Sequence, residues 1–520
     1  MAYVARPRRD NKFLNDNSSP RILLLLKTPI IGLVLILTVY FFTILFAPLR
    51  IIDDAYISFR YASNLRLHHE LSFNIGERVE GITNLLWTLL LSITNRDIVT
   101  WALVMSIFTN IWTISRIWQL GLASLISRNG TIFIAILLAV NTQFILATTN
   151  GLEAGLYSAL LCEACYQLSK GKRYTPAWLL GLLFMTRPDG ITSFPGFLVA
   201  LYLLERRWKL CVGPAIALSA LPVAVTIFRL SYYHDWIPNS VTAKAYPLNE
   251  FRALIYFGFR YILGFLETSG YWLVFPAMAI RTSLSSWLSL SRERQAVLAF
   301  SAITLLSSFA VVVRNGGDWM PNYRLLTQYM PLMACISIIM IERMRIGNWT
   351  IGLVLLWPLS LTGLSIVNNG GRVGQFSRSG FIHDFWNTSA TRLSSLVGKD
   401  DIISAEALGY VSFHLLNVRM HDPVGLTDRH IARHGKPIML YGKEDSEYTL
   451  STVSPTVALW HYTGHLSSVS SHTLSKYRTW RFGPDAGKMS TIMMIRKDQV
   501  VRLSPAVQGW TEIATLAIPR

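Results

Sequence analysis

The chain has 520 residues, of which 52% are hydrophobic and only 15% charged. This composition is too apolar for a soluble domain of such length and is typical of a protein with many membrane helices. The net charge of +18 does not indicate nucleic-acid binding, because no recognition motif accompanies it. Much of the Lys and Arg stands between apolar runs, where it sets membrane topology. We therefore expect a lipid bilayer as partner and no nucleic acid.

Apolar runs divide the chain into three parts. Residues 1–28 are basic, residues 29–367 contain successive runs long enough to span a bilayer, and residues 368–520 are polar and mixed. We expect a cytoplasmic N-terminal segment, a mainly α-helical polytopic membrane body and a C-terminal soluble domain of α/β or α+β type. The elements expected in the soluble part are a helix at 382–396, a strand at 401–404, a helix at 405–415 and a strand at 418–421.

Charged loops favour one topology. The basic residues before the first apolar run place the N-terminus in the cytoplasm, so that the chain is outside from Arg50 on. Later basic clusters should be cytoplasmic too: Lys170/Lys172/Arg173, Arg206/Arg207/Lys209, Arg292/Arg294 and Arg343/Arg345. About eleven spans satisfy them: the first run and helices at 98–121, 131–149, 152–168, 176–187, 190–205, 210–231, 256–281, 295–313, 325–341 and 349–367.

One further apolar segment, residues 82–95, looks like a span but is not included in this count. As a span it would put every later basic cluster outside, so we expect a helix that lies along the outer interface or re-enters. The external loop is then 50–97. The cytoplasmic loops are short and basic, and no G-x-x-x-x-G-K-[ST] phosphate loop occurs, which argues against an ATPase or a nucleotide-sugar site on the inner side.

Two adjacent carboxylates, Asp53 and Asp54, directly follow the first helix. One could take a proton from an attacking hydroxyl while the other orients a metal, a donor sugar or the first carboxylate, and partial burial would raise one pKa toward useful values. The alternative is a solvated helix end, with salt bridges to Arg50 or Arg60. The dipeptide alone leaves both interpretations open.

The sequence that follows the first helix resembles the first external loop of a family of GT-C superfamily membrane glycosyltransferases, which includes the mycobacterial terminal arabinofuranosyltransferase. The family's Asp-Asp-Ala-Tyr/Phe-Ile motif matches residues 53–57, and its F-N-x-G-E-x-V-E-G-x-T-N-x-L-W motif matches residues 73–87. Other matches lie in loops assigned to the outer side and in the soluble part: Asn150-Gly-Leu-Glu153, Arg187-Pro-Asp-Gly190, Pro238-Asn-Ser240 with Lys244, the segment 316–324 (GGDWMPNYR) and the segment 422–433 (DPVGLTDRHIAR). The sequence departs from the family at His68-His69-Glu70 and at Thr149-Asn150.

The resemblance implies a glycosyltransferase that moves a sugar, arabinofuranose in the best-known relatives, from a polyprenyl-phosphate donor to an envelope glycan on the outer face of the cytoplasmic (inner) membrane. It makes Asp53 the expected base and Asp54 its partner or a metal ligand, although the order could be reversed. The residues expected to bind the donor and its phosphate are Tyr56, Arg60, Arg187, Lys244 and Arg324. Other substrate-site candidates are Glu80, Asn84, Asn239, Asp318, Asp422 and Asp428.

Further expectations concern Asp189, a divalent cation and three alternative functions. Asp189 is expected to pair with Arg187 or to cap the next helix, and a divalent cation is compatible with the sequence, although no spaced set of ligands identifies a cofactor. The alternatives are a different lipid-linked sugar or a protein or lipid acceptor, a glycolipid flippase or transporter, and a membrane-anchored scaffold. A transporter should show intramembrane charges and two related halves, whereas the polar residues here gather at one face.

Overall fold

A computed structural model of the chain describes residues 29–513 except 48, 124–127, 247–249, 270–289, 319, 342–373, 439–440 and 485–489. The expected N-terminal segment, the expected span at 349–367 and the basic residues Arg343 and Arg345 lie outside the described residues.

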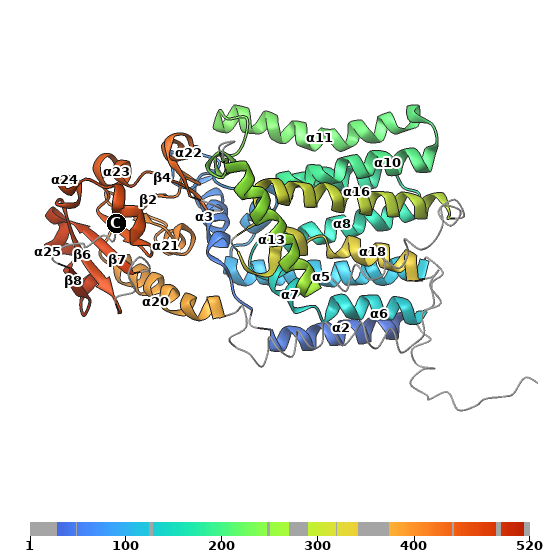
Figure 1. Cartoon of the computed structure of the whole chain (residues 1–520), viewed down its shortest axis with the longest axis horizontal. Helices are drawn as coiled ribbons and strands as arrows, with labels where there is room; N and C mark the ends of the chain where they lie inside the picture. Colours follow the sequence, from blue (N-terminus) through green and yellow to red (C-terminus); the bar gives the residue numbers. More distant parts are fainter. Residues whose placement is uncertain are drawn as a thin grey trace, which may run out of the picture.

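Long apolar helices run side by side through the first two thirds of the chain (Figure 1). Four of those described are long and apolar enough to cross a membrane: α2 (Pro29–Phe46), α5 (Ile98–Ala123), α11 (Trp208–Tyr233) and α16 (Arg292–Asn315). Leu45 is 78% and Ile216 67% exposed, and such large apolar side chains on a helix surface are stable only against lipid or another apolar surface.

The helix α6 (Arg128–Ala139) and the helix α7 (Thr142–Thr148) form a bent pair that counts as a fifth span if it is taken as one. The bend is 55°, and Asn141 stabilises it because its side chain accepts the N–H of Phe144 as the cap of α7. The remaining helices of the body among the described residues are α8 (Ala154–Ser169), α9 (Tyr174–Thr186), η1 (Pro188–Thr192), α10 (Ser193–Glu205), α12 (Asn239–Ala243), α13 (Phe251–Ser269), η3 (Pro321–Tyr323), α17 (Arg324–Thr327) and α18 (Met330–Ile341). The count of eleven spans stays a prediction.

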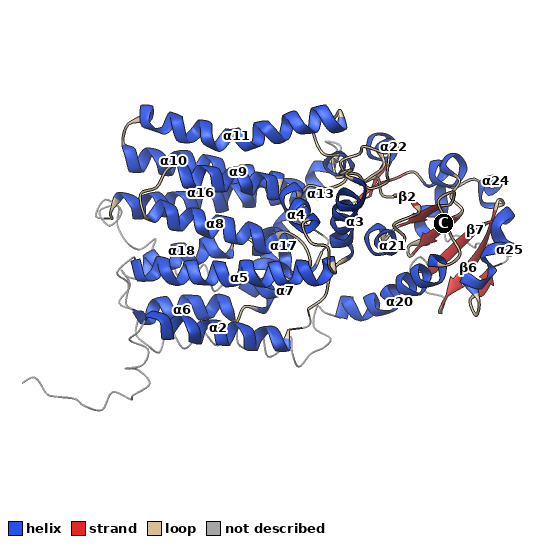
Figure 2. Cartoon of the chain, turned by 180° about the vertical axis from the view of Figure 1, so that it is seen from behind, coloured by secondary structure: helices blue, strands red, loops and turns tan. Residues whose placement is uncertain are grey.

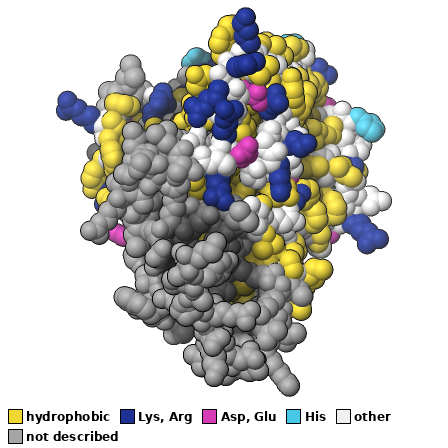
Figure 3. Space-filling model, turned by 90° about the vertical axis from the view of Figure 1, so that its right-hand side faces the viewer, with side chains coloured by type: hydrophobic (Ala, Val, Ile, Leu, Met, Phe, Trp, Pro, Cys, Tyr) yellow, Lys and Arg dark blue, Asp and Glu magenta, His cyan; other side chains and the backbone are white. Residues whose placement is uncertain are grey.

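Basic side chains gather at the end of the body that lies away from the C-terminal region (Figure 3). Two contacts connect the loops that carry them: Arg173 pairs with Glu205 at 2.7 Å, and Arg206 donates to Gln295 at 3.0 Å. The clusters at 170–173, 206–209 and 292–294 are thus neighbours at one end, as the charge pattern predicted.

The expected external loop contains two helices. The first, α3 (Asp53–His68), lies between the membrane body and the C-terminal region (Figure 2). The second, α4 (Leu85–Ser92), has 8 residues, which at about 1.5 Å per residue is much too short to cross a bilayer. This agrees with the prediction that residues 82–95 are not a span.

The C-terminal region contains a six-stranded mixed sheet in the order β2-β1-β5-β7-β6-β8. Strands β2, β1 and β5 are parallel, and β7, β6 and β8 are antiparallel. The strands are β1 (Ile402–Ala405), β2 (Arg419–His421), β5 (Val457–Trp460), β6 (Tyr477–Phe482), β7 (Thr491–Arg496) and β8 (Thr511–Ile513), and β3 (Lys436–Ile438) and β4 (Gly442–Glu444) form a separate hairpin. The longer helices are α20 (Gly374–Ser394), α21 (Leu408–His414) and α22 (Arg429–His434). Near the start of this region, the first two strands and the helix between them lie where the sequence predicted.

One apolar cluster joins this region to the external loop. It contains Ile403 and Leu459 of the sheet, Val411 of α21, and Ile57 and Tyr61 of α3. Burying apolar surface is the main favourable contribution to such an interface. The C-terminal region therefore shares its core with α3.

Arg60 of α3 lies inside this shared core, with 2% of its surface exposed. Its five N–H groups all have acceptors: the carbonyls of Phe73 (2.7 Å), Ser412, Leu415 (3.1 Å) and Val418 (2.8 Å), and the side chain of Asn74 (3.3 Å). Burial lowers the pKa of Arg60 to about 9, so the guanidinium is still charged at neutral pH. In this structure Arg60 is not available to a phosphate, contrary to the expectation, because it binds backbone carbonyls of the external loop, of α21 and of the residues that follow α21.

The substitution Arg60→Lys should loosen the C-terminal region. Lys has three donors, so at least two buried acceptors would lose their partner, at a cost of roughly 2–4 kcal/mol. We expect limited proteolysis of the detergent-solubilised protein to cut the C-terminal region at least about tenfold faster. The control is Arg66→Lys, on the same helix but exposed and bonded to the Thr94 carbonyl. Equal cleavage rates in both variants would contradict this role of Arg60.

Candidate active site

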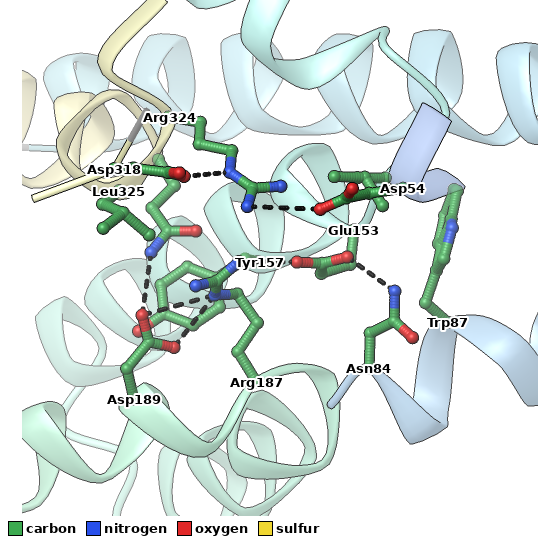
Figure 4. A network of polar contacts seen from close by, with 12 residues as sticks. Asp54, Asn84, Trp87, Glu153, Tyr157, Arg187, Asp189, Asp318, Arg324 and Leu325 are labelled. Atoms are coloured by element: carbon green, nitrogen blue, oxygen red, sulfur yellow. Dashed lines mark hydrogen bonds and ion pairs between the residues drawn. The ribbon is translucent and has the colours of Figure 1, made fainter. Parts of the chain in front are cut away.

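Acidic and basic side chains from α3 and from helices and loops of the membrane body meet in one network (Figure 4). Arg324, at the start of α17, forms an ion pair with Asp318 (2.5 Å) and a longer one with Asp54 of α3 (3.8 Å). Burial raises the pKa of Asp318, but Arg324 and Lys244 more than offset this and hold it below its usual value. Lys244 is therefore close enough for its charge to act on this group.

A second ion-pair group lies beside the first. Arg187, between α9 and η1, binds Glu153 at 2.7 Å and Asp189 at 3.0 Å. Glu153 also accepts a hydrogen bond from Asn84 at 2.7 Å, and the Asn84 oxygen accepts one from Ser58 of α3 at 3.0 Å. The predicted pairing of Asp189 with Arg187 is confirmed. Asn84 connects the external loop to this group.

The two guanidinium groups keep unused donors. Nη2 of Arg187 and both Nη atoms of Arg324 make no hydrogen bond to any residue that the structure describes. Side-chain exposure is 15% for Arg187 and 11% for Arg324, so each is largely withdrawn from water without being sealed. Cations of this kind are suited to bind an anionic group that enters from outside, because partial burial strengthens the attraction.

The two neighbouring aspartates have different surroundings. Both oxygens of Asp53 accept hydrogen bonds at the start of α21, from the N–H groups of Gly409 (3.1 Å) and Tyr410 (2.8 Å). Burial raises the pKa of Asp53 to about 6, although these N–H groups oppose the shift. The site at Gly409 has no room for a side chain, because a Cβ there would overlap the backbone oxygen of Asp53. Asp53 thus connects α3 to the C-terminal region.

Asp54 points the other way, toward Arg324 (Figure 4). Its side chain is 23% exposed and accepts no hydrogen bond from the described residues. A carboxylate that is near a cation but still accessible can accept a proton from a bound hydroxyl. Of the two acids, Asp54 therefore has the geometry of a base.

Three other predicted residues have internal partners. Tyr56 packs edge-on against Tyr410 of α21, with ring centroids 5.2 Å apart. Glu80 forms a buried bidentate ion pair with Arg229 of α11. Asn239 of α12 donates to three backbone carbonyls of the segment that follows β2, at 2.9–3.3 Å.

Asp422 and Asp428 shape that same segment. Asp422 accepts the backbone N–H groups of Val424 (2.9 Å) and Thr427 (2.6 Å), and burial raises its pKa to about 6. Asp428 caps α22 by accepting the N–H of Ile431 at 2.9 Å. Both also line a small polar cavity with His421. In this structure they are parts of a turn that Asn239 holds against the membrane body.

Sequence reasoning missed two features of the site. Arg229 was not singled out, although an arginine inside an apolar run is itself a signal that a partner carboxylate lies nearby. The other is Glu406, a carboxylate with 1% of its side chain exposed, which pairs with His461. No local pattern distinguishes Glu406 or His461. In the described part of the chain no group of three or more His, Cys, Asp or Glu residues is placed to hold a metal ion.

Removing the charge of Glu153 should destabilise the body. Glu153→Gln leaves Arg187 with Asp189 as its remaining anion, and breaking a buried ion pair by removing one partner costs about 3 kcal/mol. We expect a clear drop in the melting temperature of the purified protein. The control is Glu205→Gln, which removes an ion pair with the half-exposed Arg173 at the opposite end and should cost less than about 1 kcal/mol. An unchanged melting temperature in Glu153→Gln would show that the pair is not needed for stability.

Two curated proteins are similar to the chain, and both are named terminal beta-(1->2)-arabinofuranosyltransferase. The protein of Corynebacterium glutamicum is 28% identical over 338 residues, covering 55% of this chain and 47% of the relative. That of Mycobacterium tuberculosis is 25% identical over 374 residues, covering 61% of this chain and 58% of the relative. The chain thus spans about half to three fifths of the length of these relatives, and no family model matches it. In sequence, the chain resembles the mycobacterial arabinofuranosyltransferase family.

Proposed function

We propose that this chain is a GT-C type glycosyltransferase that transfers arabinofuranose from a polyprenyl-phosphate donor to an envelope glycan. The observation that carries the proposal is the meeting of an accessible carboxylate, Asp54, with two partly buried arginines at the end of a membrane body. A lipid-linked donor presents its phosphate at the membrane surface, so base and cations must lie together there. The names of the two similar proteins supply the sugar.

The two arginines suit the leaving group. As the bond between sugar and phosphate breaks, negative charge grows on the phosphate oxygens, and preorganised donors stabilise it. The unused N–H groups of Arg187 and Arg324 are such donors, and the exposed Lys244 adds a third positive charge at the rim. Asp318, Asp189 and Glu153 hold the two guanidinium groups in place.

Asp54 suits the acceptor. The attacking hydroxyl must lose its proton as it bonds to the sugar carbon, and Asp54 is the member of the acidic doublet that has room to take it. We therefore assign the base to Asp54 and give Asp53 the task of connecting the doublet to α21. This is the reversed order that the sequence left open.

The proposal includes a topology and a division into domains. The end that bears the basic clusters is cytoplasmic under the positive-inside tendency, and the end that bears the acidic doublet is extracytoplasmic. In this arrangement residues 1–28 are cytoplasmic, 29–367 form the catalytic membrane domain with its external loop, and 368–520 form an extracytoplasmic domain. The localisation is the cytoplasmic membrane, where lipid donor and envelope glycan meet.

The test is to measure transfer from radiolabelled polyprenyl-phosphate arabinose in proteoliposomes. Asp54→Asn should reduce the rate about 10²–10³-fold, because the base is lost while the shape of the side chain is retained. Asp53→Asn should reduce it less and should also increase cleavage of the C-terminal region by protease. The matched control is Asp400→Asn, an exposed aspartate of the C-terminal region, which should behave as the wild type.

Two results would count against this function. Full transfer by Asp54→Asn would remove the base from the mechanism. Movement of the lipid across the bilayer, with no sugar transfer by the wild type or by Asp54→Asn, would favour the flippase instead. A parallel screen with other polyprenyl-phosphate sugars identifies the donor, since a different lipid-linked sugar would leave the roles of Asp54, Arg187 and Arg324 unchanged.

A further inference from the structure

A buried charge cluster of the C-terminal region lies directly behind the start of α21. The carboxylate of Glu406, which follows β1, accepts the backbone N–H groups of His461 (2.6 Å) and Tyr462 (3.1 Å). It also pairs with two imidazoles, Nδ1 of His461 at 2.7 Å and Nε2 of His465 at 3.1 Å. One buried anion is thus matched with two histidines.

The two histidines differ in their contacts: both ring nitrogens of His465 have a carboxylate partner, whereas only one ring nitrogen of His461 has one. His465 also pairs with Glu444 of β4, so it connects the hairpin to the sheet between two carboxylates. His461 has Glu406 on one ring nitrogen, while its other ring nitrogen, Nε2, makes no hydrogen bond to a described residue. Its side chain is 18% exposed. An imidazole whose orientation is fixed through one ring nitrogen can use the other ring nitrogen to bind a ligand.

The cluster of Glu406, His461 and His465 belongs to the C-terminal region, and it lies near the place where Asp53 of α3 contacts that region. Asp53 and His461 are close enough for each to shift the pKa of the other. Burial raises the pKa of Tyr441 well above its usual value, and the charges of Glu406, Asp53 and Asp54 raise it further. Asp53 binds the first N–H groups of α21, and Glu406 lies two residues before that helix, so the pair of Glu406 and His461 lies on the C-terminal side of the acidic doublet.

We propose that His461, oriented by Glu406, binds the acceptor: its Nε2 donates a hydrogen bond to a hydroxyl oxygen of the acceptor glycan while Asp54 takes the proton of the attacking hydroxyl. This inference rests on the proposed function and names the side from which the acceptor enters. Arg187 and Arg324 hold the lipid-linked phosphate on the membrane side. The C-terminal region holds the sugar-like acceptor on the aqueous side.

The protonation state follows from the geometry. Because Nδ1 lies 2.7 Å from the ionised Glu406 carboxylate, its proton stays on the ring and faces that anion, and Nε2 carries a proton only when the ring is an imidazolium. Burial lowers the pKa of His461, but Glu406 more than compensates and raises it above the ordinary value. The other charged groups that act on the ring are His465, which lowers its pKa, and Asp53, which raises it. The donor at Nε2 is therefore present below the raised pKa and is lost as the pH rises through it.

The experiment measures KM for each substrate separately, with polyprenyl-phosphate arabinose as donor and a synthetic alkyl arabinofuranoside as acceptor. His461→Gln should raise KM for the acceptor about tenfold, the effect of losing one charge-assisted hydrogen bond, and should change KM for the donor by less than about twofold. His472→Gln, an exposed histidine of the C-terminal region, is the control and should change neither.

A pH profile separates this role from a merely structural one. In the wild type, KM for the acceptor should rise on the alkaline side as His461 loses its proton. In Glu406→Gln the same rise should occur at lower pH, because the anion that stabilises the imidazolium is gone. A second variant, His461→Asn, and the melting temperatures of all variants identify any change in KM that comes from misfolding.

The outcomes are distinguishable. If the wild type transfers and His461→Gln matches the control, or raises KM for donor and acceptor alike, the inference is overturned while the proposed function stands. An unshifted profile in a folded Glu406→Gln also overturns it. If the folded wild type transfers no sugar from any lipid-linked donor, the proposed function fails first, and the inference fails with it.

Discussion

The contact between α3 and the C-terminal region is the constraint on which the rest of the site depends. A guanidinium is expensive to bury, and Arg60 is stable in the core because each of its five donors finds an acceptor there. Four of these acceptors are backbone carbonyls, three of them at or after the end of α21. Such a set is complete only when the C-terminal region is seated, so the arginine specifies one docked position.

Docking in turn separates the functions of two adjacent acids. Asp53 lies at the helix position that meets α21 and gives both oxygens to its first N–H groups. The next residue along the helix is rotated by about 100°, which directs Asp54 toward Arg324 instead. One acid holds α3 to the C-terminal region, and the other stays accessible beside a cation. The two neighbouring residues differ because they lie on different faces of one helix.

The charges on the membrane side form an ordered set. Arg187 and Arg324 stand close enough to repel one another, and three acids, Glu153, Asp189 and Asp318, bind them. An arrangement of two cations held by surrounding anions can accept a further anion with little rearrangement. The C-terminal region has its own group of buried charges, in which Glu406 pairs with His461 and His465.

The sequence by itself determined the membrane character, the grouping of loops at two ends, that residues 82–95 do not form a span, the first strands of the C-terminal region and the motifs that carry the resemblance. These follow from apolar periodicity, charge placement and short spacings, which are local properties. The tertiary structure alone decided which member of the Asp53 and Asp54 doublet faces Arg324, that Arg60 supports the fold, that Glu80 pairs with Arg229, and that Glu406 pairs with His461. These contacts are between residues far apart in the chain, or they depend on which face of a helix is buried. A local sequence pattern therefore does not show which partner a buried polar group will have.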